Sequence, residues 1–393
     1  MRYLLYSHDG LGLGHTRRHV AIAGAIIDLE PDASVLMVTG TDDIHGLGVS
    51  PQVEVLKIPG LRKVANGRYI ARRLALEDRE IIGLRSKLIA AAVAGFRPDV
   101  MLVDKHPFGP GGELRPALTT LRAHGGRAVL GLRDILDDRA TVLGEWPAGF
   151  QRRVAAAYDR VFVYGSRAVF DPMAEYDFPP AFSQRAQFCG YVVNAAQKVI
   201  RPQIWQRDGR RAVLGCAGGG EDGFGLLENF IRASAGAPWR GIAVTGPMAG
   251  LREQEELRRL ASHAEVECHT FLPDMPRILS NVDAIVCMGG YNTLAEAATE
   301  GVPTVCVPRT QPRLEQKIRA EAFERLGILR TILPEGLRPE AVRAGVEEVL
   351  GWDRSALRQQ ARRHLEFDGA ERAARQLIEL ALPRITRPLP LAA

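Results

Sequence analysis

The residues whose types and spacing most clearly suggest chemistry are a pair of glycines, Gly289–Gly290, and the short polar run after them. The pair follows Ala284–Cys287, an apolar run typical of a buried strand, and a helix is expected to begin at Asn292 or Thr293. Such glycines let backbone N–H groups approach an anion, and the helix dipole favours negative charge at this end. Glu296 lies one turn further on the same face. Two interpretations stay open: a capping box, or a diphosphate site beside a carboxylate for ribose hydroxyls.

Other apolar runs of the second half also end in turns that suit a ligand. Gly218–Gly220 follow Ala212–Cys216 and offer backbone N–H groups to an oxyanion, although a tight structural turn fits them too. Phe271–Leu272 end a further run, where their backbone and apolar side chains suit a flat base. The amides and charged groups of Arg309–Gln316 precede or begin a helix and suit the hydroxyls of a sugar.

In the first half, a Gly-rich turn ends at His15, near the expected start of a helix over Thr16–Leu29. The helix dipole disfavours a protonated imidazole there, so His15 is expected to be neutral and able to act as a base; capping of the turn is the alternative. His19 lies one turn further on the same face, but two histidines make a poor metal site and no metal is expected. Arg17 and Arg18 suit a phosphate and solvent equally well.

Two expected strands of the first half end in polar residues that are predicted to line the same cleft as His15. Asp104 and His106 follow one of them and are candidate acceptor contacts, with turn chemistry as the alternative. Arg133 and Asp134 follow the next strand. Asp134 is the second candidate for the base, and an ion network with its neighbour is the alternative.

The segment from Leu61 to Arg73 is rich in arginine next to apolar residues such as Tyr69 and Ile70. Contact with an anionic lipid or acceptor is one interpretation. A solvated basic face is the favoured one.

The bulk composition is that of a globular protein with two domains. The chain has 393 residues, 46% of them hydrophobic, and a net charge of +5 that comes from arginines spread along the sequence. That spread does not favour nucleic-acid binding, whereas an anionic substrate or membrane surface fits it. Five cysteines without C-x-x-C spacing indicate buried free thiols in a reducing compartment, and no apolar run has the length of a membrane span. A cytoplasmic protein is expected.

Short apolar strands alternate with amphipathic helices, which predicts an α/β protein with parallel sheets. Strands are expected at Tyr3–Ser7, Val35–Thr39, Val53–Ile58, Val100–Val103, Arg127–Leu132, Arg160–Tyr164, Gln187–Gly190, Ala212–Cys216, Gly241–Thr245, Val266–Thr270, Ala284–Cys287 and Thr304–Val307. Helices are expected at Thr16–Leu29, Ile70–Gly95, Gly112–His124, Gln151–Tyr158, Gly225–Ala235, Leu251–Ser262, Met275–Leu279, Thr293–Glu300, Leu314–Leu326, Pro339–Leu350 and Arg354–His364. Two doubly wound domains facing each other would place ligands at the carboxyl ends of the strands, in the cleft between them.

Several ligand classes lack their sequence signals. The first Gly-rich turn has neither the G-x-G-x-x-G spacing nor the following acidic residue of an NAD site, and a Walker A motif is absent. The sequence also holds no D-x-D triplet, which argues against a metal-bridged diphosphate site.

Over Phe271–Arg309 the chain resembles the GT-B glycosyltransferases of the MurG type, the lipid-linked N-acetylglucosaminyltransferases. The runs that carry the resemblance are F-L-P-D-M, the strand ending in Cys287, G-G-Y-N-T-L-A-E and G-V-P-T-V-C-V-P, with weaker likeness at Gly10–His15 and Phe108–Gly112. The resemblance implies a GT-B fold of two Rossmann-like domains. It also implies an inverting, metal-independent transfer of N-acetylglucosamine or a related hexose from a nucleotide-diphosphate sugar, expected to be a UDP-sugar. The acceptor is a small molecule or lipid-linked, and peripheral contact with the inner face of the membrane is expected.

The segment from Tyr191 to Arg210 is polar, poorly periodic and carries Pro202, which predicts a linker at 193–210 between an acceptor-side domain at 1–192 and a donor-binding domain at 211–366. The resemblance implies a C-terminal helix and tail at 367–393 that return to the first domain, and it also implies site residues. The donor-binding residues would be Gly218, Gly219, Gly220, Phe271, Leu272, Met275, Gly289, Gly290, Tyr291, Asn292, Thr293, Glu296, Arg309 and Gln316. The catalytic candidates are His15 and Asp134, and the acceptor cleft would include Gly12, Gly14, Arg18, His19, Asp104, His106 and Arg133.

The first Gly-rich turn departs from the family, because Leu13 and Arg17–His19 replace small and apolar residues, and the identity of the acceptor therefore stays open. Two other functions stay open as well. One is a nucleotide-sugar hydrolase on the same scaffold, since Gly12, Gly14, His15 and Arg18 also resemble the G-x-G-H-x-x-R pattern of sugar-nucleotide hydrolases in nonulosonic acid synthesis. The other is a non-catalytic subunit that binds the nucleotide sugar.

Overall fold

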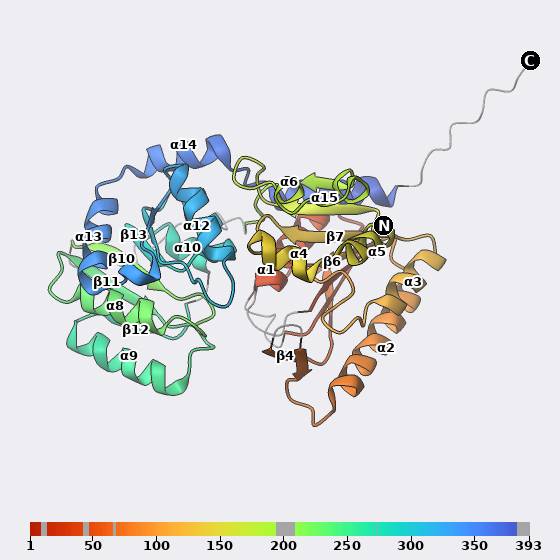
Figure 1. Ribbon diagram of the computed structural model, residues 1–393, viewed down its shortest axis with the longest axis horizontal. Coiled ribbons are helices and arrows are strands. Elements are labelled where there is room, and N and C mark those ends of the chain that lie inside the picture. Colours follow the sequence, from red (N-terminus) through yellow and green to blue (C-terminus); the bar gives the residue numbers. More distant parts are fainter. Residues whose placement is uncertain (9–13, 42–46, 66–67, 194–208, 273, 383–393) are drawn as a thin grey trace, which may run out of the picture.

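Two lobes, each built on a parallel sheet, lie side by side in the computed structural model (Figure 1). The structure describes residues 1–8, 14–41, 47–65, 68–193, 209–272 and 274–382. The prediction of two doubly wound α/β domains is confirmed. Among the described residues, no helix is both long and apolar enough to cross a bilayer.

The first lobe holds a seven-stranded sheet in the order β3-β2-β1-β6-β7-β8-β9, with each neighbouring pair parallel. Its strands are β1 (Arg2–Ser7), β2 (Ser34–Thr39), β3 (Val53–Lys57), β6 (Val100–Asp104), β7 (Arg127–Arg133), β8 (Arg160–Tyr164) and β9 (Ala186–Phe188). Its helices are α1 (Gly14–Leu29), α2 (Asp78–Phe96), α3 (Arg115–Ala123), α4 (Arg139–Glu145), α5 (Ala148–Ala157), α6 (Pro172–Glu175) and α7 (Pro180–Ser183). The central strands are almost wholly buried, as the near-continuous apolar runs of a sheet covered on both faces require.

The second lobe holds a six-stranded parallel sheet in the order β12-β11-β10-β13-β14-β15. Its strands are β10 (Arg211–Cys216), β11 (Trp239–Val244), β12 (Glu267–His269), β13 (Ala284–Cys287), β14 (Thr304–Cys306) and β15 (Arg330–Thr331). Its helices are α8 (Phe224–Ser234), α9 (Leu251–His263), α10 (Met275–Leu279), α11 (Tyr291–Glu300), α12 (Glu315–Arg325), α13 (Pro339–Leu350) and α14 (Arg354–His364), with a short 3₁₀ turn at Pro334–Gly336. In both sheets the strand order reverses beside the first strand, at β1/β6 and β10/β13, which creates a crevice at the carboxyl ends.

The helix predicted over Ile70–Gly95 is wrong at its start. The strand β5 (Arg68–Ala71) instead pairs antiparallel with β4 (Leu61–Ala65) in a hairpin of its own. Helix α2 begins only at Asp78, where the backbone N–H of Glu77 donates to the carboxylate of Glu80 at 2.9 Å. A reciprocal contact of this kind satisfies an otherwise orphaned donor and fixes the helix start there.

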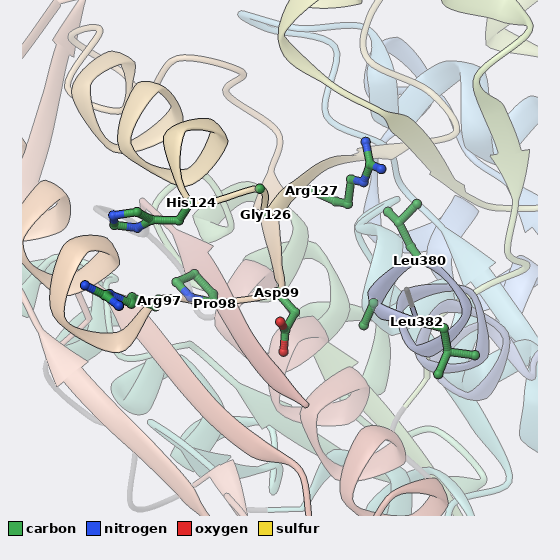
Figure 2. Close-up of a pocket in the computed structure, with 10 residues that line it drawn as sticks. Arg97, Pro98, Asp99, His124, Gly126, Arg127, Leu380 and Leu382 are labelled. Carbon is green, nitrogen blue, oxygen red and sulfur yellow. The ribbon is translucent and has the colours of Figure 1, made fainter. Parts of the chain in front are cut away.

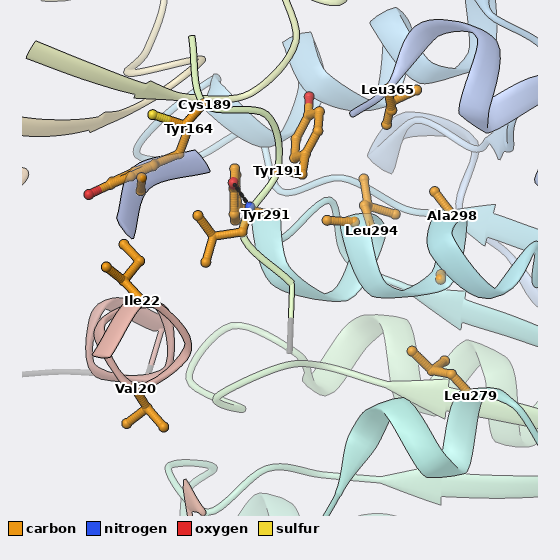
Figure 3. Packing of buried hydrophobic residues seen from close by; sticks show 14 of the residues in the cluster. Val20, Ile22, Tyr164, Cys189, Tyr191, Leu279, Tyr291, Leu294, Ala298 and Leu365 are labelled. Atoms are coloured by element: carbon orange, nitrogen blue, oxygen red, sulfur yellow. Dashed lines mark hydrogen bonds between the residues drawn. The ribbon is translucent and has the colours of Figure 1, made fainter. Parts of the chain in front are cut away.

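The two lobes share one hydrophobic core, which includes the rings of Tyr191 and Tyr291 beside Leu294 and Leu365 (Figure 3). The backbone N–H of Val192 donates to the hydroxyl of Tyr291 at 3.0 Å. The final helix α15 (Gly369–Ala381) leaves the second lobe and packs against α1 of the first. Most of the predicted linker lies outside the described residues, so the domain limits remain a prediction.

Candidate active site

A buried carboxylate orients His15 at the carboxyl end of the first sheet. His15 lies in the first turn of α1, and Asp104 ends β6, the strand next to β1. Asp104 Oδ2 lies 3.0 Å from Nδ1 of His15 and accepts from Nη1 of Arg18 at 2.6 Å. Because an ionised carboxylate only accepts, the ring proton of His15 is on Nδ1 and its Nε2 carries the lone pair. The arrangement makes Nε2 the nitrogen of the ring that can accept a proton.

The charges around this pair favour a neutral imidazole. Burial lowers the pKa of His15 to about 4, against the opposing charge of Asp104. Burial also opposes ionisation of Asp104, but the charge of Arg18 and the hydrogen bond from His15 hold the pKa of that carboxyl well below its usual range. His15 is therefore an unprotonated acceptor at neutral pH, as a general base must be.

An arginine of the first lobe lies next to Nε2 of His15 and pairs with a carboxylate of the second lobe. Arg133 Nη2 lies 3.4 Å from that atom, and Arg133 Nη1 donates to Oε2 of Glu315 on α12 at 3.3 Å. Burial opposes ionisation of Glu315, but the charges of Arg133 and Arg319 lower its pKa to about 2. Base, arginine and carboxylate thus form a line across the cleft.

Aromatic and imidazole rings cover the first-lobe side of His15. The ring of His8 lies 5.1 Å from that of His15 and 4.4 Å from that of His106, centroid to centroid. Tyr69 of the hairpin lies 6.2 Å from His106 and 6.4 Å from His8. The hairpin is thereby placed beside the candidate base.

The second lobe carries a cavity of about 220 Å³ at the carboxyl ends of β10 and β13. The residues that line it are Cys216, Ala217, Gly218, Gly219, Gly220, Glu221, Asp222, Met248, Cys287, Met288, Gly290, Thr293, Arg309 and Gln316. Seven of the predicted donor-binding residues, from separate parts of the sequence, are thus brought together: Gly218, Gly219, Gly220, Gly290, Thr293, Arg309 and Gln316. Gly220 has φ +99° and a Cβ there would lie 2.4 Å from the carbonyl oxygen of Thr245, so only glycine fits.

Glu296 lies one turn beyond Thr293 and is 3% exposed. Its Oε1 accepts from Nη2 of Arg17 at 2.5 Å, while Oε2 is buried without a hydrogen-bond partner. Burial raises the pKa of Glu296 to about 7, against the opposing charge of Arg17. The capping-box interpretation is wrong, because α11 begins one residue after Gly290 and the carboxylate contacts Arg17 instead of a backbone N–H.

Other predicted donor residues do not line the cavity. Phe271 is 52% exposed, and Leu272 and Met275 are half-buried against the shared core. The carbonyl of Gly289 accepts from Arg319 at 2.9 Å. Asn292 donates to the carbonyl of Gly14 across the cleft at 3.5 Å, and the ring of Tyr291 is buried between the lobes.

Several predicted cleft residues of the first lobe are placed in its interior. His19 is fully buried, close enough to Asp104 and Arg18 for their charges to act on its imidazole. Arg18 is buried too, with its guanidinium carbon 4.8 Å from the ring of Tyr164 and 4.9 Å from that of Tyr291. Gly12 lies outside the described residues.

Asp134, the second candidate for the base, has both carboxylate oxygens engaged. Oδ1 accepts from the backbone N–H of Ile135 at 2.8 Å and lies 3.5 Å from Nη2 of Arg319, while Oδ2 accepts from the hydroxyl of Tyr191 at 2.5 Å. Asp134 is fully buried. The geometry favours His15 as the base. Asp134 instead helps to hold the two lobes together through Arg319 of the second lobe.

A larger cavity, of about 530 Å³, lies at the opposite edge of the first sheet (Figure 2). It is lined by Asp99 and Gly126, which precede β6 and β7, and by Leu380 at the end of α15. The predicted catalytic and donor residues lie elsewhere. Because ligands of open α/β sheets bind at the carboxyl ends of the strands, the smaller cavity is the candidate site.

Sequence reasoning missed several ionic contacts that cross between the lobes. Glu315 was considered only for a sugar, and its pairing with Arg133 depends on how the lobes meet. Arg313 donates to Asp137 at 2.9 Å and to Glu145 at 2.5 Å. Among the described residues, no group of three or more His, Cys, Asp or Glu side chains is placed to hold a metal ion.

The known proteins that this chain resembles in sequence include glycosyltransferases. A model of the glycosyltransferase family 28 C-terminal domain matches residues 242–377. The UDP-N-acetylglucosamine–N-acetylmuramyl-(pentapeptide) pyrophosphoryl-undecaprenol N-acetylglucosamine transferase of Limosilactobacillus fermentum is 26% identical over 362 residues, which are 85% of this chain and 86% of that protein.

Solved structures share the whole two-lobed fold. MurG of Acinetobacter baumannii matches 96% of this chain and 100% of its own at a TM-score of 0.60 and 15% identity. The glycotransferase of kitacinnamycin matches 97% of this chain and 98% of its own at a TM-score of 0.65 and 19% identity. At these identities the likeness shows the fold alone.

Proposed function

Because the chain is a glycosyltransferase of the MurG-like GT-B type, we propose that it moves a hexose or N-acetylhexosamine from a UDP-sugar to a hydroxyl group of a lipid-linked acceptor. One observation carries the proposal. A glycine-lined cavity of the second lobe and the His15–Asp104 pair of the first lie at the carboxyl ends of their sheets, and α1 and α11 meet between them. Donor and base would then meet across one cleft.

In the proposed reaction, Nε2 of His15 takes the proton of the acceptor hydroxyl. The acceptor oxygen forms a bond to the anomeric carbon from the face opposite the diphosphate, so the configuration inverts. The bond between that carbon and the diphosphate breaks, and its electron pair leaves on the diphosphate oxygen. Asp104 stabilises the imidazolium that forms, because its carboxylate accepts from Nδ1.

The leaving diphosphate would lie in the cavity against the backbone of Gly218–Gly220 and the first turn of α11. Backbone N–H groups and the positive end of the helix dipole favour a diphosphate there. Arg309 adds a guanidinium to the lining, now paired with Asp222 at 2.7 Å. These groups supply positive charge without a bound metal, which supports metal-independent transfer. The ribose would bind the carboxylate of Glu296, and the sugar would lie near Glu315 and Gln316.

The lipid-linked acceptor is supported by a surface beside the base, which we call the hairpin surface. It consists of β4, β5, the segment 72–77 and α2 as far as Leu88, at the bottom of the first lobe in Figure 1. Its exposed apolar side chains are Val64, Leu74, Leu76, Leu84 and Leu88, and its exposed arginines are Arg62, Arg68, Arg72, Arg73 and Arg79. Apolar side chains among arginines are typical of surfaces that meet anionic lipid, and Tyr69 links this one to the ring of His106.

Binding of UDP, measured by titration calorimetry, tests the donor site. The wild type is expected to bind UDP, and Glu296→Gln is expected to weaken binding by about 10- to 100-fold, since a hydrogen bond to a charged group contributes about 1.5–3 kcal/mol. Because the pKa of Glu296 is raised to about 7, the carboxylate forms as the pH rises through 7. The UDP affinity of the wild type should therefore rise by up to about tenfold between pH 6 and pH 8, the span over which such a group ionises.

UDP itself titrates near pH 6, so Glu296→Gln is the control for that contribution. Only the difference between the two proteins reports Glu296. Equal pH dependence in both, or unchanged affinity in the variant, would contradict the ribose role of Glu296. A wild type that binds no nucleoside diphosphate would contradict the proposed function.

A further inference from the structure

Arg17 places a positive charge between the N-termini of two helices, where helix dipoles disfavour cations. It lies in the first turn of α1 and reaches from the first lobe to Glu296 in α11 of the second. Asn292, in the first turn of α11, donates to the carbonyl of Gly14 at 3.5 Å, so the two helix starts face each other. The positive ends of both dipoles and the guanidinium of Arg17 are directed at one gap.

The buried carboxylate beneath this gap is incompletely satisfied. Glu296 uses one oxygen for Arg17, and the other is buried with no partner. Its charge also acts on the thiol of Cys216, which lines the cavity. A ligand with two hydroxyl donors would satisfy both oxygens, and its hydrogen bonds would then replace the contact that Arg17 makes.

Arg17 is placed to turn towards the cavity once that contact is replaced. Its side chain is 22% exposed and pairs with Glu296 across the cleft, whereas Arg18 beside it is buried and held by Asp104. The cavity next to Glu296 holds the glycine turns and Thr293. A guanidinium that loses a carboxylate next to two oxyanions gains charge-assisted, bidentate hydrogen bonds by moving to them.

We propose that Arg17 is a catalytic residue that binds the diphosphate of the donor: the ribose takes Glu296, and Arg17 moves from Glu296 to the leaving phosphates. This inference rests on the proposed function and adds a cation from the acceptor lobe to the donor site. The lobes are thereby joined through the substrate, and positive charge is supplied where the electron pair of the breaking bond arrives.

Ligands with different numbers of phosphates distinguish a phosphate-binding role of Arg17 from a purely structural one. Calorimetry with uridine, UMP and UDP is expected to show that Arg17→Gln weakens UDP binding by about 10- to 100-fold and UMP binding by less, with uridine changed by less than about twofold, because only the phosphates meet the guanidinium. Arg17→Lys should restore part of the UDP affinity, since an ammonium keeps the charge without the bidentate geometry. Glu296→Gln should instead weaken all three ligands by a similar factor.

The control variant is Arg375→Gln, which removes a surface arginine paired with Glu371 on α15 at 2.5 Å and should leave all three affinities unchanged. A similar loss for uridine, UMP and UDP in Arg17→Gln would show that Arg17 only holds Glu296 in place, and would overturn the inference while leaving the proposed function standing. A wild type that binds none of the three would overturn both.

Discussion

Replacing His15 by alanine is expected to lower turnover by about 10²- to 10⁴-fold, the usual contribution of a general base. The affinity for UDP should stay within about twofold, because the cavity that would hold the diphosphate lies in the other lobe and His15 does not line it. The measurement is the release of UDP from a UDP-sugar in the presence of membrane lipid, together with calorimetry on the same preparation. The fold should be retained, since Asp104 keeps its contact with Arg18.

His263→Ala is the matched control, because that imidazole is exposed on α9, far from both sheets' carboxyl ends. It should turn over like the wild type. A folded His15→Ala protein with wild-type turnover would remove His15 from the mechanism and reopen the choice of base.

Asp104→Asn is expected to cause the second large loss of turnover, because it changes the tautomer of His15. An amide N–H facing Nδ1 would stabilise the proton on Nε2, so the atom that faces the substrate would no longer accept. Turnover should fall by about 10²- to 10⁴-fold with UDP affinity preserved. Arg18 would also lose its buried charge partner, which is expected to cost about 3–5 kcal/mol of the free energy of unfolding.

Asp99→Asn controls for a lost carboxylate, because Asp99 lies just before the other end of the same strand and accepts from the backbone N–H of Arg2 at 2.8 Å. Chemical denaturation and turnover are measured for both variants. If Asp104→Asn turned over normally while losing stability, the carboxylate would be structural and the pairing with His15 would have no catalytic role.

Much of the fold could be predicted because buried parallel strands are continuous apolar runs. The strand Ala284–Cys287 was predicted with its observed limits, and most others differ by one or two residues. The hairpin at Leu61–Ala65 and Arg68–Ala71 was missed, since its arginines and apolar residues also fit a helical period. The start of α2 was signalled by the acidic residues at Glu77 and Glu80, whose spacing is that of a capping box.

The donor cavity was the more predictable half of the site. Glycines after strands and a helix start with a hydroxyl are local signals, and the strand order brings Gly218–Gly220 and Thr293 together. The helical periodicity of α11 did not predict that Tyr291 is buried in the shared core. Residues of a first helical turn face the core or the cleft according to how the second lobe meets the first.

The acceptor side depended on contacts that no local pattern contains. The pairing of His15 with Asp104 follows from β1 and β6 being neighbours, which is a property of the strand order. The contacts of Arg17 with Glu296 and of Arg133 with Glu315 join residues more than a hundred positions apart in sequence and exist only once the lobes are placed. Burial of Arg18 likewise depends on the ring of Tyr291, which comes from the other lobe.

Sugar transfer into lipid tests the central claim most directly. UDP-N-acetylglucosamine and other UDP-sugars, each labelled in the sugar, are incubated with the protein and bacterial membrane vesicles, and label is measured in the butanol-extractable lipid and as free sugar in water. We predict that one UDP-sugar labels the lipid, that one UDP is released for each sugar transferred, and that His15→Ala abolishes both. Free sugar released at the same rate with and without vesicles, or no UDP release from any donor, would contradict it.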